Sequence, residues 1–514
     1  MEKPVRATEK AAPVVGFVSL GCPKNLVDSE VMMGLLDRAG ARLTARPEEA
    51  EILVVNTCSF IDTAKQESVD AILEMARHKT AGAARKLIVA GCLVERYRDE
   101  IQKNIPEVDA VVGTGELESI LEAAGIAPVP AAPALFNILA NDGGGDTRPG
   151  RESQSGTHKP SPKASSFRAE GDVRERQGRF SRNDWQGARH LLPTYLYDET
   201  TPRMLATPRA SAYLKIAEGC DHPCSFCIIP NLRGKFRSRR FESVVAEARQ
   251  LVARGVEEIT LIGQDTTCYG EDLGLKDGLA TLLDALAGIE GLRWLRFLYA
   301  YPNRITGRLL ETIAKHDNIC KYLDVPLQHA SPGVLKRMKR GAGAEIFLKT
   351  IEKVRAAVPG IALRTSFIVG FPGECASDFE VLEQFIADAK FDWLGVFNYS
   401  DEEGAGARGL DAKIPRRTIE ARRRRLMKLQ QGISREAKQQ WVGREVVLLA
   451  EGESEETPLL WEGRTEFHAP EIDGKVYIND FGELAGLEAG RFYRAQITEA
   501  HDYDVVARVV GEPL

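Results

Sequence analysis

The sequence predicts an α/β protein with two successive parallel-sheet regions and a small β-barrel at the end of the chain. Three observations support this fold class. Residues 14–126 and 209–441 alternate apolar, strand-length segments with helical patterns, and this alternation favours parallel sheets with βαβ crossovers. Residues 442–514 contain five or so short strand-like segments with glycine-containing turns, which are typical of a small barrel. A chain of 514 residues has room for about two to four domains.

The first region, residues 14–126, is expected to form a parallel α/β domain. Its apolar, β-branched runs VVGFVSL, EILVVN and KLIVA have the length of strands. The segment DSEVMMGLLDRAG has a helical pattern, and Gly40 is suited to cap the end of that helix. Strands and helices therefore follow one another as in βαβ units.

Residues 127–208 differ in composition from both neighbouring regions. They are rich in Gly, Ser, Pro and charged residues, as in GDTRPGRESQSGTHKPSPKASS. Such a segment cannot bury enough apolar surface to offset the entropy lost on ordering, so we expect a disordered linker. Residues 147–190 carry ten Lys or Arg against five Asp or Glu, so a basic tether that touches RNA is the alternative to a solvated linker.

The second region, residues 209–441, contains six predicted strands separated mostly by helical patterns. The strands are AYLKIAE, EEITLIGQD, WLRFLYAYP, YLDVPLQH, ALRTSFIVGF and WLGVFNYS. Six β/α units are fewer than the eight that close a full barrel, so a partial (β/α)6 barrel is expected. Several strands end in polar residues or glycine, and in this class of barrel functional residues gather at those ends. The long basic helix at 415–441 is expected to expose its arginines to solvent.

Composition restricts the compartment and the class of partner. The chain is 43% hydrophobic and 28% charged, which is ordinary for a soluble globular protein. The sequence contains no run of eighteen apolar residues, so no membrane span is predicted. The N-terminal segment MEKPVRATEKAAP lacks the apolar core of a signal peptide. We therefore expect a cytoplasmic protein whose nine cysteines are reduced, and clustered cysteines there more often indicate metal binding or catalysis. The net charge of -6 argues against nucleic-acid binding by the chain as a whole.

The most specific motif is C-x3-C-x2-C, directly after the first strand of the second region. We call its residues Cys220, Cys224 and Cys227 the loop trio. A closed zinc site or an ordinary iron–sulfur cluster needs four ligands, and no fourth thiolate follows nearby. A zinc knuckle would need His222, which lies between two of the cysteines and is poorly placed to be the fourth ligand. An iron–sulfur cluster on three thiolates would leave one iron open to a small molecule.

Three further cysteines occupy equivalent positions in the first region, each just after a predicted strand. We call Cys22, Cys58 and Cys92 the strand-end trio, because each closely follows a predicted strand. Their spacings of 36 and 34 residues match about one βαβ repeat each. Equivalent strand ends lie side by side in a parallel sheet, so the three thiols should converge at its carboxyl edge. A single such cysteine is usually a small buried hydrophobe, but three in phase favour a second metal site.

Other candidate features carry weaker signals. Cys268, Cys320 and Cys375 lack either pattern and are expected to be structural. The segment GAGARG at 404–409 fits the G-x-G-x-x-G pattern, but it leads into LDAKIPRR without a clear helix start. A dinucleotide site requires that helix, so we set this match aside.

The loop trio, with Phe226 just before its last cysteine, resembles the radical S-adenosylmethionine (SAM) enzymes. The segment FIVGFPGE at 367–374 is similar to the glycine-rich SAM-binding segment of that family. The resemblance implies a [4Fe-4S] cluster on the loop trio whose open iron binds SAM. It also implies reductive cleavage of SAM to a 5′-deoxyadenosyl radical, with Phe226 packed against the adenine or the cluster.

The first region narrows the resemblance to the methylthiotransferases. SLGCPKNLVDSE, NTCSFIDTAKQES and GCLVERY resemble their N-terminal domain, and residues 442–514 resemble their TRAM domain. The match covers all but the linker and the extreme ends. It implies a second [4Fe-4S] cluster on the strand-end trio, whose open iron carries the sulfur to be transferred. The linker is longer than is usual in the family, which leaves the relative placement of the two cluster domains open.

Two branches of this family differ at the first two cysteines. The tRNA-modifying, MiaB-like branch usually reads GCxMN and NTCxxR, whereas this chain reads GCPKN and NTCSFI. These motifs resemble those of the RimO-like branch, which modifies a ribosomal protein. The substrate of that branch is an aspartate in the twelfth small-subunit ribosomal protein. The implied partners are that basic protein, free or in the ribosome, and an electron donor. tRNA remains the alternative substrate.

Charge offers a discriminator between the two substrates. Residues 444–514 hold 16 acidic and 6 basic side chains, a formal net charge of -10. An RNA-binding barrel should carry a basic face, whereas an acidic surface suits a basic protein. A non-enzymatic electron carrier is disfavoured, because carriers usually complete their clusters with four cysteines.

Overall fold

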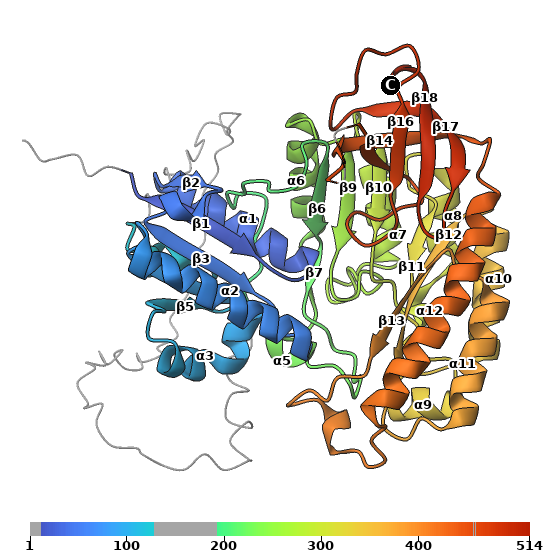
Figure 1. Ribbon diagram of the computed structural model, residues 1–514, viewed down its shortest axis with the longest axis horizontal. Coiled ribbons are helices and arrows are strands. Elements are labelled where there is room, and N and C mark those ends of the chain that lie inside the picture. Colours follow the sequence, from blue (N-terminus) through green and yellow to red (C-terminus); the bar gives the residue numbers. More distant parts are fainter. Residues whose placement is uncertain (1–11, 128–192, 456, 458) are drawn as a thin grey trace, which may run out of the picture. The chain divides into compact units, whose positions relative to one another are not determined.

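The computed structural model describes residues 12–127, 193–455, 457 and 459–514 (Figure 1). These residues belong to one compact unit of the chain. The predicted linker lies mostly outside the described residues. Its last part, residues 193–208, is described and has a folded environment.

The N-terminal region is a five-stranded parallel sheet with helices on both faces. The strand order is β2-β1-β3-β4-β5, so the three long strands predicted from the sequence are neighbours. The strands are β1 (Val14–Ser19), β2 (Arg42–Thr44), β3 (Ile52–Thr57), β4 (Lys86–Gly91) and β5 (Ala110–Val112). The helices are α1 (Pro23–Arg38), α2 (Asp62–Ala81), α3 (Cys92–Asn104) and α4 (Ile120–Ala124), with 3-10 turns η1 (Pro47–Glu49) and η2 (Leu117–Ser119).

The central strand of this sheet shows why the sequence folds in this way. All six residues of β3 are buried, as expected for a continuous apolar run covered on both faces. Val54 packs in the same cluster as residues of α1 and α4, whereas its neighbour Val55 packs with residues of α2 and α3. Alternate side chains thus point to opposite faces of the sheet.

The second region is an open arc of six parallel strands. Two three-stranded sheets, β10-β9-β6 and β11-β12-β13, meet where the Ala300 amide donates a 2.9 Å hydrogen bond to the Asp324 carbonyl. In the described ranges no strand pairing joins β6 to β13, so the predicted partial barrel is confirmed. The strands are β6 (Ser211–Lys215), β9 (Glu258–Ile262), β10 (Trp294–Phe297), β11 (Tyr322–Asp324), β12 (Ala362–Val369) and β13 (Trp393–Asn398), with a small hairpin of β7 (Ala217–Glu218) and β8 (Arg237–Ser238).

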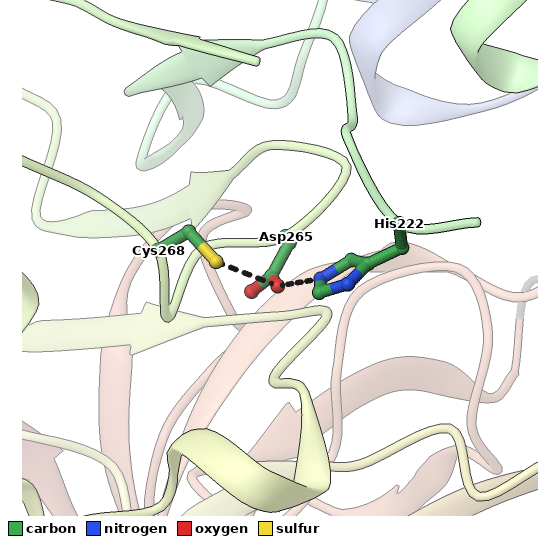
Figure 2. A group of neighbouring side chains, drawn as sticks. All are labelled: His222, Asp265 and Cys268. Carbon is green, nitrogen blue, oxygen red and sulfur yellow. Dashed lines mark hydrogen bonds and ion pairs between the residues drawn. The ribbon is translucent and has the colours of Figure 1, made fainter. Parts of the chain in front are cut away.

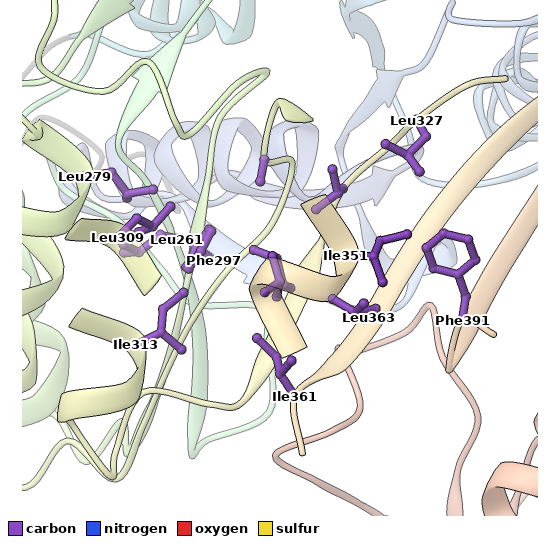
Figure 3. Packing of buried hydrophobic residues seen from close by; sticks show 14 of the residues in the cluster. Leu261, Leu279, Phe297, Leu309, Ile313, Leu327, Ile351, Ile361, Leu363 and Phe391 are labelled. Carbon is purple, nitrogen blue, oxygen red and sulfur yellow. The ribbon is translucent and has the colours of Figure 1, made fainter. Parts of the chain in front are cut away.

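Helices cover the outer face of this arc, and apolar side chains fill the space between the two layers. Figure 3 shows Leu279 and Ile313 from two helices gathered near Leu261 and Phe297 from two strands. Burying each such side chain contributes about 1.5–3 kcal/mol. None of the helices in the described ranges is long and apolar enough to cross a membrane. The helices are α5 (Ile229–Arg233), α6 (Phe241–Ala253), α7 (Gly278–Ala287), α8 (Gly307–Lys315), α9 (Pro332–Arg337), α10 (Ala344–Ala357), α11 (Ala376–Ala389) and α12 (Arg416–Gln439), with 3-10 turns η4 (Pro302–Arg304) and η5 (Gly406–Gly409).

The C-terminal region is a closed five-stranded barrel, as predicted. Its strand order is β14-β15-β16-β18-β17, and β14 pairs with both β15 and β17 to complete the circle. Arg464 of this barrel forms a buried ion pair with Glu258 of β9, which ties the barrel to the second region. The strands are β14 (Glu445–Glu453), β15 (Trp461–Thr465), β16 (Val476–Asp480), β17 (Phe492–Ala500) and β18 (Val505–Pro513).

Residues 193–208 differ from the predicted disordered linker. Tyr197 is only 3% exposed. Arg203 pairs with Glu30 of α1 at 2.5 Å and with Glu247 of α6 at 2.8 Å. The segment thus spans the first two regions, and the predicted end of the linker at residue 208 is too late. The proline- and threonine-rich composition concealed a buried aromatic residue and a doubly paired arginine.

Candidate metal centres

The strand-end trio lies at the carboxyl ends of three adjacent strands. Cys22 caps the start of α1 after β1, Cys58 follows β3, and Cys92 begins α3 directly after β4. Because these strands are neighbours in the order β1-β3-β4, the structure brings the three cysteines to one edge, as the repeat spacing predicted. Cys92 interacts electrostatically with both other thiols, and Cys58 interacts with Cys22.

The backbone around this trio is fixed by close contacts. Gly21 has φ +91°, and a Cβ there would lie 2.8 Å from the Cys58 Cβ, so only glycine fits. The Asn25 side chain donates to the Leu20 carbonyl at 2.7 Å and to the Thr57 carbonyl at 3.2 Å. These bonds hold the ends of β1 and β3 together, and with them the loops that carry Cys22 and Cys58.

The loop trio lies in the segment between β7 and α5, which is pinned through Ser225. The Ser225 amide donates to the Met338 carbonyl at 3.0 Å, and its hydroxyl donates to the Arg337 carbonyl at 2.8 Å. The Ser225 carbonyl accepts from the Ala407 amide at 2.7 Å. Partners more than a hundred residues away in sequence thus hold a short loop in one conformation.

Hydrogen-bond donors point at several of the cysteine sulfurs. Arg340 Nη1 donates to Cys224 Sγ at 3.6 Å, and the Ile229 amide donates to Cys227 Sγ at 3.5 Å. The backbone amides of Phe60 and Ser59 also favour the charged form of Cys58. Donors of this kind favour the charged thiolate, which is the form that ligates metals.

Burial has the opposite effect on the free thiols. It raises the pKa of Cys92 to about 12, that of Cys227 to about 12 and that of Cys220 to about 11. Thiols with such pKa values are poor nucleophiles at neutral pH. A bound metal ion supplies the positive charge that deprotonates a coordinating thiol outright. The donor sets are therefore suited to metal ligation and not to nucleophilic catalysis.

The spacing of the sulfurs distinguishes between kinds of metal site. A single tetrahedral zinc with Zn–S bonds of 2.3 Å places its sulfurs about 3.8 Å apart. Among the described residues, three potential ligand atoms lie within 4.8 Å of one another only in the group His222, Asp265 and Cys268. Neither cysteine trio meets that limit, so the sulfurs of both lie further apart than a mononuclear zinc site requires.

His222 is engaged away from the cysteines that flank it. Figure 2 shows Asp265 between His222 and Cys268. The His222 ring nitrogen lies 2.6 Å from the Asp265 carboxylate, and Cys268 Sγ donates to the same carboxylate at 3.1 Å. The His222 ring also stacks on Tyr301 with centroids 3.9 Å apart. His222 therefore braces the loop, which disfavours the zinc-knuckle alternative and agrees with a structural role for Cys268.

Arg233 connects the two trios, and sequence reasoning did not identify it. It ends α5, the helix that follows the loop trio, and is 2% exposed. Its guanidinium pairs with Asp28 at 2.6 Å and with Glu218 at 3.2 Å, and it donates to Asn25 at 3.1 Å. It also interacts electrostatically with Cys92. Arg340, which sequence reasoning also missed, lies 4.4 Å from the centroid of the Tyr301 ring. Neither arginine stands in a recognisable local motif.

Two predicted segments near the loop trio have defined conformations. In the glycine-rich segment 367–374, the amides of Gly370 and Phe371 donate to the Glu374 carboxylate at 2.6 and 3.2 Å. GAGARG ends in the four-residue turn η5, without the helix that a dinucleotide site needs, so its rejection is borne out. Phe226 is half-buried and packs against the barrel core; its contact with adenine or the cluster stays a prediction.

Comparisons with known proteins identify families and relatives that this chain resembles. Family models match residues 14–113 (Uncharacterized protein family UPF0004), 214–386 (Radical SAM superfamily) and 442–510 (TRAM domain). The chain is 66% identical to ribosomal protein uS12 methylthiotransferase RimO of Koribacter versatilis, over 96% of each chain. It is 54% identical to the protein of the same name from Solibacter usitatus, over 97% of this chain and 95% of that one.

Similarity to solved structures is more distant. The radical SAM methyltransferase TsrM of Kitasatospora setae is 15% identical, with a TM-score of 0.47 over 77% of this chain and 74% of that chain.

Proposed function

Because this chain belongs to the RimO family of ribosomal protein uS12 methylthiotransferases, we propose that it adds a methylthio group to the β-carbon of an aspartate in uS12 with two [4Fe-4S] clusters. The protein is a radical SAM methylthiotransferase. The observation that carries the two-cluster proposal is the pair of three-cysteine sites, which Arg233 of α5 connects.

The two trios have different tasks in this proposal. The loop trio Cys220, Cys224 and Cys227 holds the cluster that binds SAM, and the strand-end trio Cys22, Cys58 and Cys92 holds the cluster that carries the sulfur. When bound, these groups supply a methyl donor, a transferable sulfur and, with one electron from an external donor, a radical that removes hydrogen from the β-carbon. Side-chain acid–base chemistry cannot break an unactivated C–H bond, which is why cofactors are needed.

The protein's own residues position these groups. Arg340 and the Ile229 amide donate to sulfurs of the loop trio and stabilise their negative charge. Ser225 holds the loop in place, and Asn25 holds the strand ends. Phe226, half-buried beside Cys227, is proposed to pack against the adenine of SAM or the cluster.

Mass spectrometry of uS12 tests the proposed function. In cells that contain the enzyme, one aspartate of uS12 should gain about 46 Da, the mass that a methylthio group adds when it replaces hydrogen. Deletion of the gene should abolish the gain, and the wild-type chain should restore it. Unmodified uS12 together with a methylthiolated tRNA nucleoside that depends on this gene would move the substrate to the tRNA alternative.

The acidic C-terminal barrel favours a protein substrate over RNA. With 16 acidic residues against 6 basic ones, the barrel should attract the basic ribosomal protein. Charges are screened beyond roughly 8 Å at physiological ionic strength, so this attraction should weaken as the salt concentration rises. Reversing the exposed Glu453 and Glu455 to Lys should slow association with uS12 more than it speeds dissociation. The exposed Glu290, on the second region, provides the control E290K, which should leave the association rate within twofold.

This prediction is tested by stopped-flow measurement of the uS12 association rate over a range of salt concentrations, with tRNA as competitor. Bulk tRNA should compete poorly. The assignment of uS12 as the substrate would be contradicted if the chain bound tRNA more tightly than uS12 and the reversed variants associated with uS12 faster than wild type.

A further inference from the structure

Lys24 is a buried cation with no anionic partner. It lies in the first turn of α1, two residues after Cys22, and is 8% exposed. Its ammonium sits 3.3 Å from the centroid of the Tyr299 ring. Within the described ranges it makes no hydrogen bond or ion pair with another side chain. A buried ammonium without an acceptor is costly, so a position of this kind needs an explanation.

The carboxylates nearest to Lys24 are already engaged by other cations. Lys24 interacts electrostatically with Asp324 and Glu218. Asp324 accepts from Arg364 at 2.9 Å, and Glu218 accepts from Lys215 at 2.7 Å. Since each carboxylate has its own partner, the three N–H donors of the Lys24 ammonium remain available to an acceptor from outside the chain.

Tyr299, on which Lys24 rests, is held in a strained backbone conformation. Its φ of +64° is rare for a bulky residue, and such strain collects at functional sites. The Tyr299 amide donates to Asp324 at 3.0 Å, and its carbonyl accepts from the Thr266 amide at 3.2 Å. Two residues later, Tyr301 stacks on His222 within the loop trio segment.

One short turn therefore lies within electrostatic range of both cysteine sites. Tyr299 interacts with Cys22 of the strand-end trio, and Tyr301 interacts with Cys220 and Cys224 of the loop trio. A substrate carbon that loses hydrogen at one site and gains sulfur from the other has to lie between them. Lys24 borders that position.

We propose that Lys24, seated on the Tyr299 ring, binds the carboxylate of the target aspartate and thereby determines substrate specificity. The inference rests on the proposed function. The aspartate carboxylate is bonded directly to the β-carbon that reacts, so an ion pair with Lys24 positions that carbon within one bond. A neutral side chain or a nucleobase offers no carboxylate and leaves the ammonium unpaired, which disfavours its binding.

Peptide binding by the full-length, cluster-loaded chain tests this proposal. The probes are a fluorescent uS12 peptide that spans the target aspartate and the same peptide with Asp→Asn, measured by anisotropy with SAM but without reductant, so that no turnover occurs. K24M keeps most of the length of the side chain and removes its charge, and K24Q is a second neutral variant. Wild type should bind the Asp peptide about 10- to 100-fold more tightly than the Asn peptide, as expected for hydrogen bonds to a charged group.

The decisive quantity is how far each substitution at position 24 changes the preference for the Asp peptide over the Asn peptide. K24M and K24Q should weaken binding of the Asp peptide to the level of the Asn peptide and leave the Asn peptide nearly unaffected. K24R, which keeps the charge, should retain the preference for Asp. Cleavage of SAM without peptide, measured in the same variants, reports whether the loop trio is still intact in each of them.

Lys438 offers a matched control. It is also a buried lysine on an aromatic ring, 3.6 Å from the centroid of Trp393, but it lies on α12 away from both trios. K438M should keep the wild-type preference between the two peptides.

Two outcomes would overturn the inference. Equal losses for both peptides in the neutral variants would assign Lys24 a purely structural role, and an undiminished preference for Asp would show that another group reads the carboxylate. Failure of the proposed function is separate: wild type would then neither bind the Asp peptide nor modify uS12, whatever residue stands at position 24.

Discussion

The strand-end trio and the loop trio each present three thiols, but the chain builds them differently. Cys22, Cys58 and Cys92 come from three strands, and their proximity depends on the register of the whole parallel sheet. The loop trio lies within eight residues, from Cys220 to Cys227, and depends on distant segments that clamp its loop. The strand-end trio is thus a product of topology, whereas the loop trio is a local motif that needs long-range support.

The connection between the two sites is also unequal. Arg233 extends from the helix that follows the loop trio to Asp28 and Asn25, which belong to the helix that Cys22 caps. Changes at Arg233 should therefore affect the strand-end trio at least as much as the loop trio. This asymmetry gives experiments that separate the two sites.

The largest expected effect is a division of labour between the trios. Changing Cys220, Cys224 and Cys227 together to Ala should abolish both SAM cleavage and methylthio transfer. Changing Cys22, Cys58 and Cys92 together to Ala should abolish transfer but spare reductive SAM cleavage, because only the sulfur-bearing cluster is lost. The measurements are 5′-deoxyadenosine by chromatography and modified uS12 by mass spectrometry. A strand-end variant that still modified uS12 would refute the division.

A smaller effect is expected at Arg233. R233M removes a cation from the buried Asp28 and Glu218, so that Lys215 remains as their buried cationic partner. The free energy of unfolding of the metal-free chain should therefore fall by about 3 kcal/mol. Urea denaturation measures this change. The exposed Arg249, on the neighbouring helix α6, supplies the control R249Q, which should stay within about 0.5 kcal/mol of wild type. A fall at R233M no larger than that of the control would show that the connection contributes nothing.

The smallest expected effect concerns the clamp on the loop trio. S225A removes the hydroxyl bond to the Arg337 carbonyl and should cost about 1 kcal/mol, because the backbone bonds to Met338 and Ala407 remain. Iron of the loop trio should be released to a chelator a few-fold faster, while the strand-end iron is unaffected. The exposed Ser377 provides the control S377A. Equal acceleration at both sites would contradict a local role for Ser225.

The contrast between the trios also explains what the sequence could predict. Apolar runs located the three long strands of the first region and the main strands of the other two regions, but not the three-residue strands β2 and β5. The spacing of Cys22, Cys58 and Cys92 predicted their convergence, because strand ends in a parallel sheet are geometrically equivalent. Residues 193–208 were misassigned, because the single buried Tyr197 and the ion pairs of Arg203 leave no periodic pattern.

The supporting residues lay beyond sequence analysis for a similar reason. Arg233, Arg340 and Lys24 act through partners that are distant in sequence, and a charged residue in one sequence looks the same whether it is solvated or buried. Only the folded chain shows that Lys24 rests on Tyr299, 275 positions further along.

Iron content is the most direct test of the central claim that each trio holds its own cluster. Anaerobically reconstituted wild-type chain should bind about eight irons, and each triple Cys→Ala variant should bind about four, with an equal amount of acid-labile sulfide in each case. Iron and sulfide assays on the three proteins measure this. About four irons in the wild-type chain, or zinc in place of iron, would contradict the account.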